Sequence, residues 1–189
     1  TSDDTDAYER VKIQYGTSYV YPISCMGAHV SSVPNQQVGR TTPLKTRGNV
    51  AMFGAFGYEM DLNTLSDSDK EIVKEQVHFF KEHRKLFQYG RFYRLQNPFE
   101  QNDAAWMSVD SDKNEAIVGF YRKLGIPNGP WERLYLQGLA EDKEYVINDD
   151  ETQSYYGSEL MNAGLVIHQE DLCDGGGDFC SALYHIKVK

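Results

Sequence analysis

The spacing of apolar and polar residues changes in character near residue 90 of the chain. Before that point, segments with helical spacing alternate with short apolar runs, a pattern typical of βα units. An amphipathic helix is predicted over residues 8–19. Residues 21–30 and 51–62 are apolar without clean alternation, which predicts two strands that are buried on both faces. A polar loop follows the first of these strands, and Pro43 marks the start of another helix.

The clearest helix signal covers residues 66–88. Ser66 followed by Asp69 is close to a capping box in which Asp replaces the usual Glu, and Gly90 suits the end of the helix. His78 and His83 fall on or beside this helix, and we assign neither a function, because histidines in such positions are usually surface or boundary residues. The apolar stripe of the helix consists of Ile72, Val73, Val77, Phe80 and Phe87.

From Phe92 onward the pattern changes to short runs of period two that are separated by turns. Residues 111–114 and 128–130 have turn composition. Several short strands with almost no helix signal predict an antiparallel β-sandwich. We therefore expect two parts, residues 1–88 and residues 89–189, with the long helix leading directly from one to the other. The predicted strands are 91–95, 104–109, 115–124, 132–139, 145–148, 165–168 and 181–189.

Composition and charge narrow the range of partners. The 189 residues carry a net charge of −9, which argues against nucleic acid, because its phosphates require basic patches. No apolar run approaches the ~20 residues of a membrane span and no signal-peptide pattern is present, so we expect a cytoplasmic protein without a membrane partner. The three cysteines lack metal-ligand spacing and fit reduced thiols, although Cys173 and Cys180 could pair across a Gly-rich loop. We expect no metal and no cofactor.

Three carboxylates, Asp3, Asp4 and Asp6, lie within four positions just before the first predicted helix. Thr5 or Asp6 can cap this helix by accepting hydrogen bonds from its free backbone N–H groups. Three neighbouring carboxylates also resist ionising together, and an acid that stays protonated is what general acid catalysis requires. These residues alone are compatible both with helix capping and with general acid catalysis.

The βα part corresponds to about a quarter of a (β/α)8 barrel, which typically has ~250 residues, so it needs partners outside this chain. In barrel enzymes, groups at the carboxyl ends of the strands perform the chemistry. The acidic segment, residues 1–7, lies between an inferred preceding strand and a helix. His29 and Ser31 lie at the end of the next strand. Arg40 and Arg47 could pair with the acids, and spacing selects neither. The expected fold class is α/β plus all-β: an incomplete (β/α)8 barrel of about two βα units, followed by an antiparallel β-sandwich.

Long collinear segments of the chain resemble glycoside hydrolase family 36 α-galactosidases. TSDDTDA, ERVKIQYGTSYVYP and MGAHVSSVPNQQVGRTTPLKTRGNVAMFGAFGYEMDL resemble the end of that family's catalytic barrel. QVHFFKEHRKLFQYGRFYRL, NPFEQNDAAWMSV and YYGSELMNAGL resemble its C-terminal sandwich. The resemblance covers nearly the whole chain. Gln36 stands where members usually have His, the turn at 155–161 is about one residue shorter, and the Cys173–Cys180 region is unfamiliar.

The resemblance implies a retaining α-galactosidase that acts on melibiose- or raffinose-type oligosaccharides. Such enzymes use two carboxyl groups about 5–5.5 Å apart. The family's acid/base is the first Asp of a Ser-Asp-Asp/Asn-Thr-Asp motif, which corresponds to Asp3. The nucleophile is an Asp in a Lys-Trp-Asp context that this chain lacks, so we expect the isolated chain to be inactive and its partner to be the missing N-terminal part of the parent. Asp4, Asp6 and His29 are candidate substrate-binding or supporting residues, and we expect the parent to be a homo-oligomer.

Two alternatives remain open at the level of the sequence. The first is a non-catalytic β-sandwich module that binds carbohydrate or stabilises an assembly. The second stays within the resemblance: a galactosyl transferase of the raffinose-synthase type, or an N-acetylgalactosaminidase. The aromatic residues that could form a sugar-stacking face in the first alternative are Phe92, Tyr93, Trp106, Tyr121, Trp131, Tyr135, Tyr155 and Tyr156, most of them at positions typical of a core.

Overall fold

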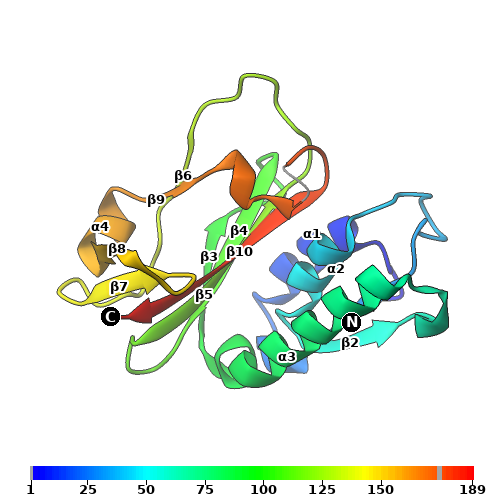
Figure 1. The fold of residues 1–189 in the computed structure, drawn as a ribbon, viewed down its shortest axis with the longest axis horizontal. Coiled ribbons are helices and arrows are strands. Elements are labelled where there is room, and N and C mark those ends of the chain that lie inside the picture. The colour runs from blue at the N-terminus through cyan, green and yellow to red at the C-terminus, as the bar shows by residue number, and fades with distance from the viewer. Residues whose placement is uncertain (1, 174–175) are drawn as a thin grey trace.

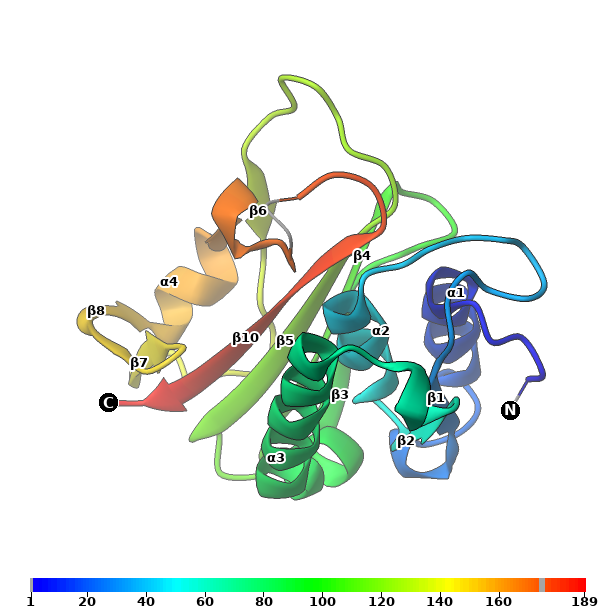
Figure 2. The same ribbon diagram turned by 45° about the vertical axis from the view of Figure 1, so that its right-hand side comes forward.

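An antiparallel sheet of six strands runs through the centre of the molecule (Figure 1). The computed structural model describes residues 2–173 and 176–189. Thr1 of the acidic segment and residues 174–175 of the Gly-rich loop lie outside the described residues. Figure 2 shows the helices α1, α2 and α3 on one side of the sheet and α4 with β6 on the other side. The fold is therefore an α/β segment joined to a β-rich segment.

The first segment alternates helices and strands, as the sequence predicts. Its two strands pair in parallel, with Gly27 opposite Ala55 and Ser31 opposite Glu59. A helix connects the two strands, as a parallel pair requires. The elements are α1 Ala7–Thr17, a 3-10 helix Ile23–Cys25, β1 Gly27–Ser31, α2 Leu44–Ala51, β2 Ala55–Glu59, a 3-10 helix Leu62–Thr64 and α3 Asp67–Tyr89.

The predicted limits of both strands are wrong at their N-terminal ends, and the second strand also ends earlier than predicted, at Glu59. The second strand is partly exposed, so the prediction that it is buried on both faces is wrong. Residues 21–26 form a 3-10 turn in which the amide of Cys25 donates to the carbonyl of Pro22, so the first strand begins only at Gly27. Residues 51–54 complete α2 and the turn after it, because the amide of Met52 still bonds to the carbonyl of Gly48. The apolar character of these residues reflects packing of the helix end, which hydrophobicity alone cannot distinguish from a strand.

The long helix α3 begins and ends close to the predicted positions. Ser66 is its N-cap, and its hydroxyl accepts a hydrogen bond from the amide of Asp69 at 3.1 Å. Phe80 and Phe87 are buried, as the apolar stripe predicts. The stripe also contains Gln76, which is buried because its side-chain oxygen accepts a hydrogen bond from the Tyr58 hydroxyl at 2.6 Å.

The second segment contains eight strands and one short helix. The six-stranded sheet has the order β3-β4-β5-β10-β7-β8, and β6 and β9 form a separate antiparallel pair. The strand predicted over 132–139 ends at Leu134, and the sequence analysis missed β8 and α4. The elements are β3 Arg91–Gln96, β4 Asp103–Val109, β5 Glu115–Arg122, β6 Glu132–Leu134, β7 Glu144–Ile147, β8 Asp150–Tyr156, α4 Gly157–Asn162, β9 Leu165–Ile167 and β10 Cys180–Val188, with a 3-10 helix Gln169–Asp171 before β10.

The central strands are buried on both faces. In β4, Ala104 and Trp106 pack against the helical segment, which consists of α1, α2 and α3. Met107 and Val109 pack against the layer formed by β6, β9 and α4. Every residue of β4 is therefore buried, and the strand carries two apolar cores. Removing the Trp106 ring would affect the core that joins the sheet to α1 and α3.

The three cysteines, Cys25, Cys173 and Cys180, are free thiols, so the pairing of the last two is not observed. The Sγ of Cys173 instead lies 2.9 Å from the hydroxyl of Thr46, across the contact between α2 and β10. Within residues 2–173 and 176–189, none of the helices is both long enough and apolar enough to cross a bilayer.

Candidate active site

The acidic segment folds so that Asp6 caps α1. The Asp6 carboxylate accepts hydrogen bonds from the amides of Tyr8 at 3.1 Å and Glu9 at 3.0 Å. These two amides have no partner inside the helix, and the positive end of the helix favours a carboxylate. The predicted capping role is confirmed for Asp6.

Asp6 is also paired with Arg40 in the interior. The guanidinium of Arg40 donates to the same carboxylate and lies 4.5 Å from the centroid of the Phe179 ring. The Asp6 side chain is only 1 % exposed, so solvent does not reach its charge. Arg47, the other candidate partner, donates to the backbone carbonyls of Thr42 and Ser31 instead.

Asp4 shapes the backbone that leads into the helix. One of its carboxylate oxygens accepts a hydrogen bond from the amide of Asp6 at 2.9 Å, which closes a local turn. Asp4 is half-buried, and its carbonyl accepts a hydrogen bond from Arg10 at 3.0 Å. Part of its hydrogen-bonding capacity is therefore used locally.

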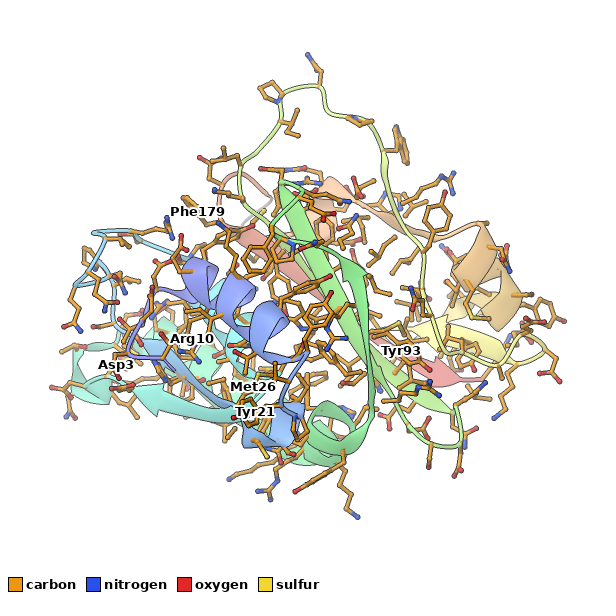
Figure 3. All side chains as sticks on the ribbon, turned by 180° about the vertical axis from the view of Figure 1, so that it is seen from behind. Asp3, Arg10, Tyr21, Met26, Tyr93 and Phe179 are labelled. Atoms are coloured by element: carbon orange, nitrogen blue, oxygen red, sulfur yellow. The ribbon has the colours of Figure 1, made fainter. Side chains whose placement is uncertain are left out.

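Asp3 differs from both neighbours because its side chain makes no bond within the described part of the chain. Its carbonyl accepts a hydrogen bond from the side-chain amide of Gln37 at 3.1 Å, which fixes the backbone against the loop that follows β1. Among residues 2–173 and 176–189, no side chain or amide is bonded to the Asp3 carboxylate, and the residue is exposed. Figure 3 shows Asp3 at the periphery of the helical segment, with Arg10 farther inside. An exposed carboxylate on a fixed backbone is available for chemistry.

Gln37 and Asn35 hold the acidic segment at the carboxyl end of β1. Gln37 accepts a hydrogen bond from the amide of Thr5 at 3.0 Å, and Asn35 donates to the Thr5 hydroxyl at 2.9 Å. Both residues belong to the loop that leaves β1 after Ser31. The acidic segment and the end of the next strand are thus brought together, as expected for groups at the rim of parallel strands.

Arg10 is a positioning residue that the sequence analysis missed. It is buried on α1 and donates to the carbonyls of Ser2, Asp4 and Gly27, which links the acidic segment to the start of β1. Burial lowers the pKa of its guanidinium, while the Asp4 carboxylate acts in the opposite direction. The sequence offers one indication of its burial: Arg10 is next to Val11, on the side of the helix that faces the interior.

His29 lies within β1, opposite Gly57 of β2. Its Nε2 is 3.2 Å from a carboxylate oxygen of Glu59, and its side chain is 20 % exposed. Burial and the nearby positive charge of Arg10 lower the pKa of His29, and Glu59 only partly opposes them. His29 therefore stays neutral to a lower pH than an ordinary histidine.

A groove lies elsewhere on the described residues. It has a volume of about 520 Å³ and is lined by α2, α3 and β10, including Lys45, Glu75 and His185. Around Asp6 and Arg40, the described residues form only a shallow depression. Among the described residues, the acidic segment therefore borders no enclosed cavity.

The lowered pKa of His29 predicts a specific pH dependence of stability. The unfolded chain binds a proton at His29 more readily than the folded chain does, so the free energy of unfolding falls as the pH drops below about 6.5. We expect the substitution His29→Gln to remove this pH-dependent part of the free energy of unfolding. The measurement is urea unfolding at pH 7 and pH 5, with His78→Gln, an exposed residue of α3, as the control. Identical pH dependence in the two variants would contradict the environment described for His29.

Comparisons with known proteins identify the class of this chain. Residues 1–90 match the Melibiase family model, and residues 103–186 match the model of the glycosyl hydrolase family 36 C-terminal domain. Together the two matches leave only short segments unassigned. The chain belongs to glycoside hydrolase family 36.

Individual relatives agree along the whole chain. Alpha-galactosidase AgaA from Geobacillus stearothermophilus is 51 % identical over 188 residues, which are 100 % of this chain and 25 % of the relative. Alpha-galactosidase Mel36A from Lactobacillus acidophilus is 45 % identical over 99 % of this chain and 25 % of its own length. A crystal structure of an AgaA variant in complex with raffinose has a TM-score of 0.94 and 49 % identity, with coverage of 100 % of this chain and 25 % of that chain. The chain spans about a quarter of the length of the curated relatives it matches.

Proposed function

We propose that this chain is part of a retaining α-galactosidase that hydrolyses terminal α-linked galactose from raffinose- or melibiose-type oligosaccharides. The observation that carries the proposal is the exposed Asp3 carboxylate, which makes no bond among the described residues, while the Asp3 backbone carbonyl accepts a hydrogen bond from Gln37 in the loop that follows β1. Family membership supports the reaction class, because both relatives named above are alpha-galactosidases and one of them has been crystallised with raffinose. Hydrolysis, rather than galactosyl transfer, is the simplest reaction consistent with these relatives.

In this proposal Asp3 is the acid/base. It protonates the departing glycosidic oxygen and afterwards removes a proton from the attacking water. The nucleophile is a second carboxylate outside this chain, about 5–5.5 Å away in an assembled retaining site. His29 and Asp4 border the sugar, whereas Asp6 supports the segment from below through its bonds to α1 and Arg40.

The architecture of the parent follows from the same proposal. The β1–α2–β2–α3 segment forms the last two βα units of a (β/α)8 barrel, and residues 89–189 form its C-terminal β-sandwich, in which the β6–β9 pair faces the larger sheet. Among the described residues, β1 and β2 pair only with each other, so the barrel strands of the parent complete this sheet. We further propose a cytoplasmic, homo-oligomeric parent; the three free thiols are compatible with a reducing compartment.

The proposal predicts that this chain alone does not turn over an α-galactoside. A chromogenic aryl α-galactoside is incubated with the purified chain and, in parallel, with a longer protein that contains it. We expect release of the chromophore only by the longer protein, because this chain carries at most one of the two catalytic carboxyl groups. Circular dichroism of the purified chain serves as the folding control. Hydrolysis by the chain alone, at a rate that depends on Asp3, would contradict this division of the catalytic groups.

A further inference from the structure

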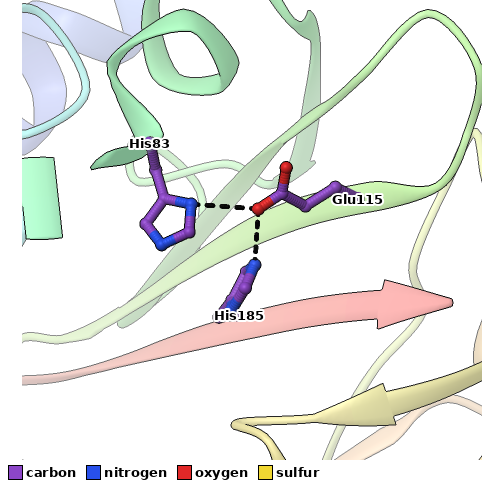
Figure 4. A group of neighbouring side chains, drawn as sticks. All are labelled: His83, Glu115 and His185. Carbon is purple, nitrogen blue, oxygen red and sulfur yellow. Dashed lines mark hydrogen bonds and ion pairs between the residues drawn. The ribbon is translucent and has the colours of Figure 1, made fainter. Parts of the chain in front are cut away.

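Three side chains from distant parts of the sequence converge beside the long helix. His83 comes from the C-terminal half of α3, Glu115 is the first residue of β5, and His185 lies on β10 (Figure 4). In the β5–β10 ladder, Ile117 is opposite His185 and Lys187 is opposite Glu115, so Glu115 and His185 are diagonal neighbours. Ile117 packs against the helical segment, and Glu115 and His185 share its face of the sheet.

The carboxylate of Glu115 accepts a hydrogen bond from each of the two imidazole rings. Its Oε1 atom lies 2.9 Å from Nδ1 of His83 and 2.7 Å from Nε2 of His185. Each residue contributes one ligand atom, and these three atoms lie within 4.8 Å of one another. Two imidazole nitrogens and one carboxylate oxygen are a ligand set that zinc uses in proteins, with one further position for water.

The distances leave room for an ion after a small adjustment. Zinc binds imidazole nitrogen at about 2.0–2.1 Å and carboxylate oxygen at about 2.0–2.2 Å, so tetrahedral ligand atoms are separated by about 3.3 Å. The observed separations of 2.7 and 2.9 Å are those of hydrogen bonds. A shift of about half an ångström by the Glu115 side chain, which is 35 % exposed, would open the required space.

The surroundings restrict the two rings and place further charged groups near them. The ring of Phe79 packs against His83 and His185, with centroid distances of 4.5 and 6.2 Å, and this restricts both imidazoles. Two further acids face the group: Glu82 of α3, 4.0 Å from Nε2 of His83, and Asp149 of the β7–β8 turn, whose pKa is lowered chiefly by its bond to Lys187. A carboxylate beside the second nitrogen of a liganding histidine is a common way to orient the ring.

We propose that His83, Glu115 and His185 bind one divalent transition-metal ion, for which zinc is the best match. The ion would replace the two hydrogen bonds with coordination bonds and link α3 to the central sheet. This site is separate from the acidic segment and does not depend on the proposed glycosidase activity. Sequence patterns could not indicate it, because each ligand lies on a different element and none has a ligand as a near neighbour in sequence.

The test is equilibrium dialysis of the full chain against zinc at pH 7.5, with the bound metal quantified per chain. We expect one zinc ion per chain, and at least about tenfold weaker binding in His185→Gln and in Glu115→Gln, which keeps the shape of the side chain. His78→Gln is the matched control, because His78 is exposed on the same helix and also lies beside Glu82, at 3.7 Å. It should bind zinc like the original chain.

Acidification gives an independent readout on the same protein. Imidazole must be unprotonated to bind a metal, so protons compete with the ion and binding should be weaker at pH 5.5 than at pH 7.5. Circular dichroism of each variant at both pH values verifies that the fold persists. Failure to bind zinc in the micromolar range at pH 7.5, or equal binding by His185→Gln and His78→Gln, would overturn the proposal and leave the group as a hydrogen-bonded link between α3 and the sheet.

Discussion

Replacing Asp3 by Ala in a longer chain that contains this segment lowers kcat/KM for raffinose by about 10²- to 10⁴-fold, the range that general acid catalysis usually contributes. The sugar oxygen that leaves from raffinose is a poor leaving group, so it depends on a proton delivered as the bond breaks. We propose Asp3 for this role because its carboxylate is exposed and unbonded among the described residues, while its backbone carbonyl is bonded by Gln37.

The matched control for Asp3 is Glu9→Gln. Glu9 is another partly exposed carboxylate of the same region, and its closest charged partner is Arg40 at 3.9 Å. We expect this variant to change kcat/KM by no more than about twofold, since so long an ion pair contributes little. Equal losses in the Asp3 and Glu9 variants would mean that negative charge near α1, and not a specific acid, supports the reaction.

Replacing Asp6 by Ala lowers the free energy of unfolding of this chain by about 3 kcal/mol or more. The substitution removes the cap of α1 and leaves Arg40, whose side chain is 20 % exposed, without its carboxylate partner. Loss of a cap typically costs about 1 kcal/mol, and breaking a buried ion pair about 3–5 kcal/mol. Urea unfolding followed by circular dichroism measures the change, with an unaltered m-value as the sign that the unfolded state is the same.

A second carboxylate at a helix start provides the control for Asp6. Asp67 begins α3, is fully exposed and lies 3.2 Å from Lys70, so Asp67→Ala should cost less than about 1 kcal/mol. The double substitution Asp6→Asn with Arg40→Met should recover part of the loss, because no buried charge remains unpaired. If Asp6→Ala and Asp67→Ala were equally mild, the supporting role of Asp6 would have to be abandoned.

The parts of the fold that follow local rules could be predicted from the sequence. Ser66 caps the longest helix, and the period-two runs around Trp106 and Phe120 form neighbouring strands of the sheet. The sequence analysis missed β8 because it is a mostly exposed edge strand whose polar residues show no alternation. It missed α4 because six residues are too short for a helical stripe to stand out.

The candidate site shows the same division between local and distant causes. The capping role of Asp6 is local and follows from its position before the helix. The choice of Arg40 over Arg47 as its partner depends on the path of the loop after β1, which no spacing rule specifies. The role of Arg10 could not be predicted for a similar reason. Its partners are backbone carbonyls, which every residue type has, so the sequence does not indicate them.

The aromatic residues of the second segment bear on the alternative of a sugar-binding module. Trp106 and Tyr121 are fully buried, and their rings pack against each other at a tilt of 39°, with a centroid distance of 4.5 Å. Trp131, Tyr135 and Tyr156 are exposed, but they lie on β8 and on segments around β6 rather than along one strand face. Phe92, Tyr93 and Tyr155 are partly buried and pack against the two cores. The prediction that most of these aromatics belong to the core therefore holds, with Trp131, Tyr135 and Tyr156 as the exceptions.

The most direct test of the account is the dependence of kcat/KM on the leaving group in the longer protein and its Asp3→Ala variant. A series of aryl α-galactosides with phenols of increasing acidity is hydrolysed by both. We expect kcat/KM to depend weakly on the phenol pKa in the original protein and steeply in the variant, with the two lines meeting at the most acidic phenols, which need no proton. Parallel lines across the series would contradict the assignment of Asp3 as the acid.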